Sequence, residues 1–173
     1  FNNKLKKSFD EIFSSPLKRS IQTAKKFKSK KITIDKLLKE INYGDAEGFD
    51  INQLKKTYPR IIKNWNLKKD SKFPNGENNS MVALRVKKFI KNLISKVKNN
   101  KSKKYLVVTH NVFLRSLIGG YFQIHKSEWH KLKIHHLEKF NFILLNGKLI
   151  SNINRKTLKK VLNFKTNEPS SIN

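Results

Sequence analysis

Two segments of this 173-residue chain carry side chains that could bind a phosphate group. The first, FSSPLKR, ends at Arg19, and the second, VVTHNVFLR, contains His110 and Arg115. A guanidinium offers a planar fork of donors that matches two phosphate oxygens. An imidazole can donate to an oxygen whose negative charge grows in a transition state. These residue types therefore indicate a site for a phosphorylated ligand.

Both segments have the same predicted design, which is an apolar strand, a polar turn and a helix. Residues 9–14 read as one strand, and the apolar run 104–110 is typical of a central parallel strand covered on both faces. In open α/β sheets, ligands bind beyond the carboxyl ends of the strands, where helix N-termini expose free N–H groups. We therefore expect Arg19 and His110 to meet at one edge of the sheet.

The remaining pattern predicts the elements around these two. Residues 31–34 read as a further strand, and residues 51–65 as a helix interrupted at Pro59. Apolar residues recur at helical spacing from Val82 to Val97, which predicts a long amphipathic helix. Its expected cap is Asn78 or Asn79. Glu77 is expected either to cap the same helix, which is the simpler interpretation, or to face the crevice.

The predicted fold class is α/β, with three layers. A mostly parallel sheet carries helices on both faces. Asn146-Gly147 separates two apolar segments and predicts a C-terminal antiparallel hairpin at the edge of the sheet. We assign residues 1–164 to a single domain and residues 165–173 to a disordered tail.

The composition is strongly basic, with a formal net charge of +27, yet only five of the 39 basic residues are arginines. The lysines are scattered along the chain without an arginine-rich block, which favours a solvated surface over a nucleic-acid site. The chain has no cysteine, which fits a reducing compartment such as the cytoplasm. No apolar run approaches the ~18 residues that span a membrane, so no membrane partner is expected.

Four motifs, in order, resemble those of the histidine phosphatase superfamily (phosphoglycerate mutase-like, branch 1). FSSPLKRSIQTA is similar to its Ser-x-Leu-x-Arg segment, and LLKEINYGDAEGF to the segment that carries an acidic residue. FPNGENNSMVALRVKKFI resembles the Gly-Glu-Ser segment, with Asn78 where Ser is usual. YLVVTHNVFLR resembles the second catalytic His segment, with Asn111 where Gly is commonest. The motifs extend over about residues 5–120 of the chain.

The resemblance implies a role for each matching residue. Arg19 would bind the transferred phosphoryl group, and Glu40 would be the general acid that protonates the leaving alkoxide. His110 would stabilise the phosphoryl oxygens, with Asn111 as a further phosphate-binding residue and Thr109 near the same pocket. The implied activity is hydrolysis of small phosphomonoesters through a phosphohistidine, without a cofactor or a metal.

The family's nucleophile is the histidine of an Arg-His-Gly motif at the end of its first strand. The chain contains no such tripeptide. We therefore expect the first strand to lie upstream of Phe1, and the chain alone to be inactive.

Several alternatives remain open at this point. A phosphoglycerate mutase is disfavoured because Trp65 lacks the adjacent arginines of the mutases. A non-catalytic basic module that binds nucleic acid is the other alternative. Each candidate residue also has an ordinary interpretation, as a surface cation, a solvated carboxylate or a buried histidine. Arg85 is expected to be a helix-surface or packing residue and Arg115 a structural one. The four histidines from His125 to His136 lack the spacing of a metal site.

Overall fold

The centre of the fold is a small parallel sheet of three strands. The computed structural model describes residues 8–97, 103–151, 153 and 161. Strand β2 (Glu11–Ser14) lies between β4 (Ile32–Ile34) and β5 (Tyr105–Val108). Both pairings are parallel, so the carboxyl ends of all three strands lie at the same edge of the sheet.

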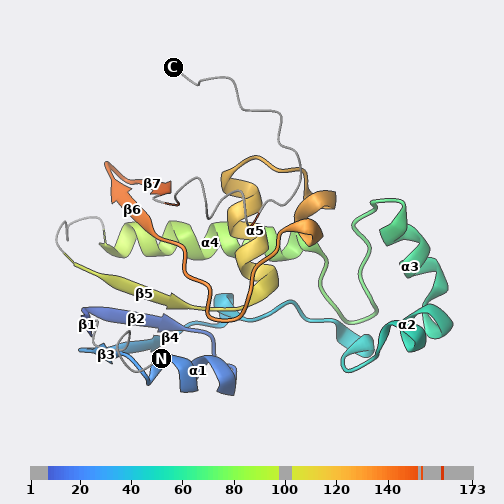
Figure 1. Cartoon of the computed structure of the whole chain (residues 1–173), viewed down its shortest axis with the longest axis horizontal. Coiled ribbons are helices and arrows are strands. Elements are labelled where there is room, and N and C mark those ends of the chain that lie inside the picture. The colour runs from blue at the N-terminus through green and yellow to red at the C-terminus, as the bar shows by residue number, and fades with distance from the viewer. Residues whose placement is uncertain (1–7, 98–102, 152, 154–160, 162–173) are drawn as a thin grey trace.

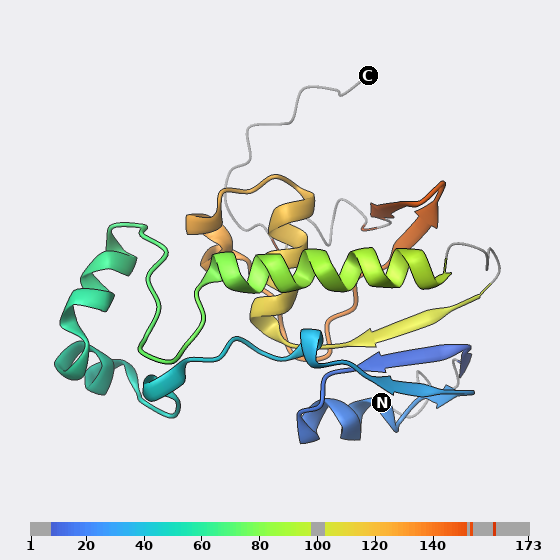
Figure 2. The same ribbon diagram turned by 180° about the vertical axis from the view of Figure 1, so that it is seen from behind.

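Helices cover both faces of this sheet. Helix α1 (Lys18–Ala24) lies on one face, and α4 (Asn79–Val97) with α5 (Asn111–Tyr121) lies on the other (Figures 1 and 2). The arrangement confirms the predicted three-layer α/β/α fold. Asn78 caps α4 as expected, because its side-chain oxygen accepts from the Met81 N–H.

The main core lies between β2 and the helices α4 and α5. The predicted apolar stripe of α4 supplies its buried wall, and Phe89 stands between the rings of Phe13 and Phe113 in two edge-to-face contacts. Such contacts add a few tenths to about 1.5 kcal/mol beyond burial of the rings. The buried members of this cluster are Phe13, Leu38, Ile41, Val82, Val86, Phe89 and Phe113.

Strand β5 differs from the expectation in one respect. It was predicted as a central strand covered on both faces, but it pairs only with β2 among the described residues, and its four residues are half-buried. The central strand is β2, all four residues of which are buried. The apolar run of β5 gave no information on this point, because edge and central parallel strands can have the same composition.

The predicted C-terminal hairpin is present. Strands β6 (Phe142–Leu145) and β7 (Lys148–Ser151) pair antiparallel around Asn146-Gly147, both of which have a positive φ. Asn and Gly tolerate that conformation, as a two-residue turn of this kind requires. Within the described residues no ladder joins the hairpin to the three-stranded sheet. The predicted tail, residues 165–173, lies outside the described residues.

A short parallel pair, β1 (Ser8–Phe9) with β3 (Lys28–Ser29), lies beside the sheet. The 3-10 turns are η2 (Lys36–Leu38), η3 (Gly44–Ala46) and η4 (Lys126–Lys131). Among the described residues, no helix is both long and apolar enough to cross a membrane.

Two further helices, α2 (Ile51–Thr57) and α3 (Pro59–Asn66), extend to one side of the sheet (Figure 1). Pro59 divides them as predicted, because it starts α3 in the first helical turn, where its missing N–H costs nothing. The pair has its own small core around buried Phe73, whose ring contacts Tyr58 and Trp65.

Candidate active site

His110 lies where the carboxyl ends of β2 and β5 meet. The Ser15 N–H donates to the Val108 carbonyl at 3.0 Å, which continues the pairing of the two strands by one residue. Ser15 and His110 are therefore brought together by the strand register. The imidazole is buried, at 7% exposure, and its Nε2 lies 2.8 Å from Ser15 Oγ and 3.1 Å from Ser20 Oγ.

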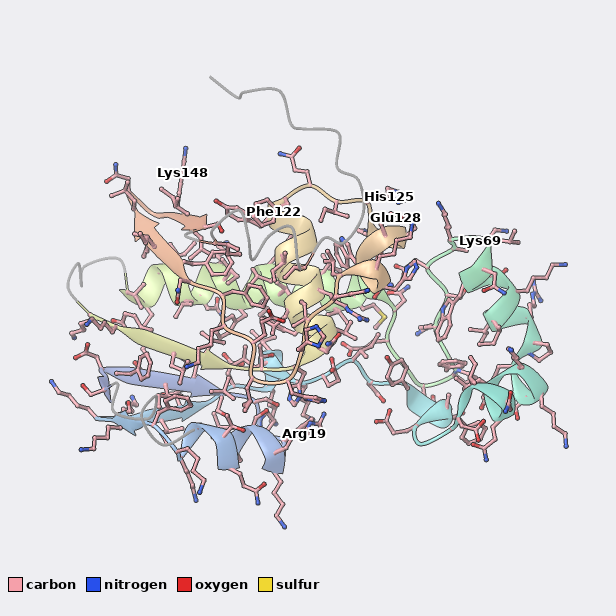
Figure 3. All side chains as sticks on the ribbon, viewed as in Figure 1. Arg19, Lys69, Phe122, His125, Glu128 and Lys148 are labelled. Carbon is pink, nitrogen blue, oxygen red and sulfur yellow. The ribbon has the colours of Figure 1, made fainter. Side chains whose placement is uncertain are left out.

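Arg19 contacts the other nitrogen of the same ring. Its Nε–H donates to His110 Nδ1 at 3.3 Å. Arg19 is the second residue of α1, and it is exposed, on the face of the sheet opposite α4 (Figure 3). Within the part of the chain that the structure describes, its two Nη groups have no acceptor, so they are free to bind an anion.

The hydrogen bond from Arg19 determines the tautomer of the neutral imidazole. Guanidinium nitrogens only donate, so Nδ1 must be the acceptor and Nε2 must carry the proton. Burial, together with the positive charges of Arg19 and Arg85, lowers the pKa of His110 from 6.5 to about 4. The imidazole is therefore neutral near pH 7, and it donates through Nε2 to a serine hydroxyl.

Glu40 reaches the same edge from a loop. The loop follows β4 and η2, and the Thr109 hydroxyl ties it to the end of β5 by donating to the Leu38 carbonyl at 2.9 Å. The carboxylate accepts 3.1 Å hydrogen bonds from the backbone N–H groups of Asn111 and Val112. Glu40 thus occupies the N-terminus of α5, one residue beyond His110, where its carboxylate satisfies two N–H groups that have no partner within the helix.

The side chain of Asn111 points elsewhere. Its Nδ2 donates to the Ile134 carbonyl at 2.9 Å, so the amide fastens the segment after η4 to α5. Its backbone N–H, and not its side chain, faces the site. That N–H is already bonded to the Glu40 carboxylate, so the phosphate-binding role assigned to Asn111 stays a prediction without a free donor behind it.

Arg115 makes a structural contact, as the sequence led us to expect. Its Nε–H donates to the Leu132 carbonyl at 3.0 Å, beside the contact of Asn111 with Ile134. Burial lowers the pKa of Arg115, and nearby Tyr43 and Glu40 oppose that shift. The guanidinium therefore lies within the electrostatic field of the site without contacting His110.

The structure thus brings Arg19, Glu40 and His110 to one edge of the sheet, as predicted. Sequence reasoning missed the two hydroxyl partners of His110, Ser15 and Ser20. Ser20 directly follows Arg19, so its place beside a candidate ligand was the available signal, and its burial became known only from the structure. Among the described residues, no three His, Cys, Asp or Glu side chains gather as a metal site requires.

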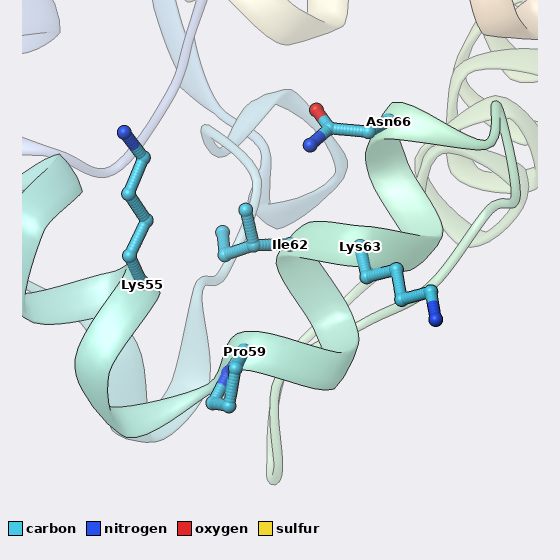
Figure 4. Close-up of a pocket in the computed structure, with 5 residues that line it drawn as sticks. All are labelled: Lys55, Pro59, Ile62, Lys63 and Asn66. Carbon is cyan, nitrogen blue, oxygen red and sulfur yellow. The ribbon is translucent and has the colours of Figure 1, made fainter.

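Two cavities lie away from this edge. One, of about 290 Å³, lies between α2 and α3 (Figure 4) and is lined by Lys55, Pro59, Ile62, Lys63 and Asn66. The other, of about 1170 Å³, lies between α4, α5 and the hairpin. Neither contains Arg19, Glu40 or His110. The convergence of charged groups identifies the candidate site, and cavity size does not.

The fold and the site together define an α/β protein that presents anion-binding groups at the carboxyl ends of parallel strands. Residues 1–148 match the family model described as histidine phosphatase superfamily (branch 1). The chain belongs to the histidine phosphatase superfamily, which confirms the family inferred from the four motifs. Membership supports a function of the phosphatase or mutase type.

Solved structures show the same fold. Bacillus stearothermophilus YhfR superposes with a TM-score of 0.70 at 19% identity, over 84% of this chain and 73% of that one. The alpha-ribazole phosphatase from Shigella flexneri gives 0.71 at 21% identity, over 87% and 76%. Mycobacterial glucosyl-3-phosphoglycerate phosphatase Rv2419c gives 0.58 at 21% identity, over 70% and 61%. No curated protein matches this chain.

Proposed function

We propose that this chain forms most of a phosphatase domain that hydrolyses small phosphomonoesters through a phosphohistidine intermediate. The observation that carries the proposal is the contact between Arg19 Nε and His110 Nδ1, with the Glu40 carboxylate on the amide of the next residue. A cation, an imidazole and a carboxylate at one edge are the groups that phosphoryl transfer to a histidine needs around the reacting phosphorus.

In the proposed reaction, the Nη groups of Arg19 bind two phosphoryl oxygens. His110 stabilises the charge that grows on the oxygens as the ester bond breaks. The nucleophilic nitrogen forms a bond to phosphorus while the P–O bond to the leaving group breaks, and Glu40 gives its proton to the departing alkoxide. Water then attacks the phosphohistidine, the carboxylate of Glu40 takes a proton from it, and inorganic phosphate leaves.

The nucleophile of this scheme is not His110. The Nδ1 of His110 accepts from Arg19, and its Nε2 is bonded to serine hydroxyls, so neither ring nitrogen is free to attack phosphorus. The chain contains no Arg-His-Gly tripeptide. The proposal therefore takes the nucleophilic histidine from sequence outside these 173 residues.

A small phosphomonoester is the substrate class that two similar structures support. Both the Shigella and the mycobacterial proteins are named as phosphatases of such esters. The scheme uses neither a metal ion nor a nucleotide. A cytoplasmic location, which the lack of cysteine favours, would give such a site access to phosphorylated metabolites.

Hydrolysis of p-nitrophenyl phosphate by the full-length protein, with and without EDTA, tests the proposal. We expect turnover that EDTA does not change, and a phosphohistidine that acid quenching destroys and alkaline quenching preserves. Absence of turnover, or strict dependence on a metal, would overturn it. Residues 1–173 alone should be slower by on the order of a million-fold, the usual cost of losing a nucleophile.

The mutase alternative has its own assay. With 3-phosphoglycerate as substrate, a phosphatase releases inorganic phosphate and glycerate, whereas a mutase returns a phosphoglycerate with the phosphoryl group moved. Trp65, the one tryptophan between Glu40 and His110 in the sequence, is followed by Asn66 and not by arginine, which supports hydrolysis.

A further inference from the structure

Arg85 in the second turn of α4 uses every donor of its guanidinium. Its Nε and Nη2 bind the two carboxylate oxygens of Glu77, at 2.8 and 3.0 Å. Its remaining N–H groups donate to three backbone carbonyls, those of Leu37 at 2.9 Å, Lys39 at 2.7 Å and Glu40 at 3.1 Å. A guanidinium carries five N–H groups, and all five are bonded here.

The three carbonyls belong to one turn of chain, which ends at Glu40. Glu77 holds the residues just beyond that turn, because its carboxylate accepts from the Asn42 N–H at 2.9 Å and its own N–H donates to the Asn42 carbonyl at 2.7 Å. The loop that carries Glu40 is therefore fastened on both sides by one ion pair. The side chains of Arg85 and Glu77 are only 13% and 19% exposed, so water competes weakly for these bonds.

Fixing the backbone fixes where the carboxylate of Glu40 can reach. Its hydrogen bonds to Asn111 and Val112 are long-range contacts, and they need the loop to stand at one distance from α5. Thr109 adds the connection to β5 through Leu38, but it holds neither Glu40 nor Asn42. Among the described residues, it is the side chain of Arg85 that hydrogen-bonds to the backbone carbonyl of Glu40.

We propose that Arg85 and Glu77 form a positioning pair for Glu40, which sets its carboxylate at the N-terminus of α5 for protonation of the leaving group. This inference rests on the proposed function, because it assigns a means of placement to the general acid. Neither residue contacts His110, so Arg85 acts through the loop and is not a catalytic residue. The sequence alone predicted a packing role for Arg85 and a capping role for Glu77.

The cap prediction for Glu77 was wrong. The first N–H groups of α4 donate to Asp70 and Asn78, so the helix start is satisfied without Glu77. Glu77 is left for Arg85 and Asn42. The pKa of its carboxyl lies below its usual range, because hydrogen bonds from Arg85 and Asn42 outweigh the opposing effect of burial.

The test is the dependence of kcat/KM on the leaving group in Arg85→Lys of the full-length protein, because kcat/KM excludes the attack of water on the phosphohistidine that all substrates share. An ammonium keeps the charge but cannot bind three carbonyls and a carboxylate at once. Misplacing a reacting group by about 1 Å costs about a hundredfold. We expect kcat/KM to fall about that much for an alkyl phosphate, which needs a proton on its leaving oxygen. For p-nitrophenyl phosphate, which needs it far less, we expect a fall of less than about threefold.

Two comparisons separate positioning from general destabilisation. Glu40→Gln should show the same selectivity for leaving groups, and adding Arg85→Lys to it should cost little more, because both changes remove one function. Arg60→Lys, at an exposed position of α3, makes the same chemical change away from the loop and should leave both rates unaltered. Equal loss on both substrates in Arg85→Lys would overturn the proposal.

A readout that needs no activity keeps this test distinct from the proposed function. Amide hydrogen exchange at Asn111 and Val112 reports the bonds to Glu40. We expect at least about tenfold faster exchange there in Arg85→Lys, with other α5 amides unaffected. If Arg85→Lys shows faster exchange but the wild-type protein has no phosphatase activity, the proposed function is refuted and the positioning of Glu40 stands. Unchanged exchange in Arg85→Lys would refute the positioning of Glu40. If Arg85→Lys fails to fold, the milder Glu77→Gln is judged by the same criteria.

Discussion

Arg19 and His110, which are 91 residues apart in the sequence, share a 3.3 Å hydrogen bond at the carboxyl end of the sheet. The bond occupies the lone pair of Nδ1 and directs the proton of the neutral imidazole to Nε2. It also places a positive charge against a buried ring, which is one cause of the low pKa of His110. An anion that binds between these residues would therefore change the bonding of Nδ1, the position of the ring proton and the pKa of His110.

Replacing Arg19 by lysine should weaken binding of inorganic phosphate by about tenfold to a hundredfold, because hydrogen bonds to a charged group contribute about 1.5–3 kcal/mol and lysine cannot form the bidentate pair. Isothermal titration of the full-length protein measures this. Arg60→Lys serves as the matched control, since Arg60 is exposed on α3. Equal affinity in the two variants would exclude Arg19 from the anion site.

Phosphate binding should raise the pKa of His110. In the free protein, burial and the positive charges of Arg19 and Arg85 lower the pKa of the ring to about 4. A phosphate dianion that draws the guanidinium away from Nδ1 would free the lone pair and favour the imidazolium. Nitrogen-15 NMR titration of the ring, with and without phosphate, follows both states. A free-protein pKa near 6.5, or one that phosphate does not move, would contradict the site described here.

The same low pKa makes stability depend on pH. The unfolded chain binds the His110 proton at 6.5 and the folded protein only near 4, so this group destabilises the fold as pH falls between those values and has no effect above them. The loss should reach about 3 kcal/mol, since each unit of pKa shift corresponds to about 1.4 kcal/mol.

Urea unfolding of the wild type and of His110→Asn across that range isolates this contribution. The lowered carboxyl pKa values of Glu11 and Glu77 also weaken the fold in acid, but they act equally in both proteins. The difference in unfolding free energy between the two proteins should therefore narrow towards pH 4. A constant difference would show that His110 titrates normally in the folded state.

Two adjacent glycines of α5 should respond oppositely to alanine. A methyl group on Gly119 would overlap the indole of buried Trp129, so Gly119→Ala should destabilise the fold by about 1–3 kcal/mol. A methyl group on Gly120 would meet nothing within 4 Å, so Gly120→Ala should stabilise the fold by up to about 1 kcal/mol through helix propensity. Urea unfolding compares them, and equal stabilities would refute the packing of Trp129 on α5.

The local sequence pattern predicted the main helices, strands and turns well. The helical stripe from Val82 to Val97, the break at Pro59 and the turn at Asn146-Gly147 were all found where the sequence placed them. Each depends on side chains within a few residues of one another, and periodicity and turn chemistry report such relationships directly. The position of β5 at the edge of the described sheet did not follow, because strand order is a relationship between distant segments.

By itself, the sequence determined which groups could act on a phosphate and that Arg19 and His110 each lie where an apolar strand gives way to a helix, since strand composition and helix starts are local signals. Only the tertiary structure decided what surrounds them. Ser15 and Ser20 meet His110, and Arg85 with Glu77 holds the loop of Glu40, through contacts between residues far apart in the chain. Such contacts depend on how the elements pack, and one sequence carries no periodic signal for them.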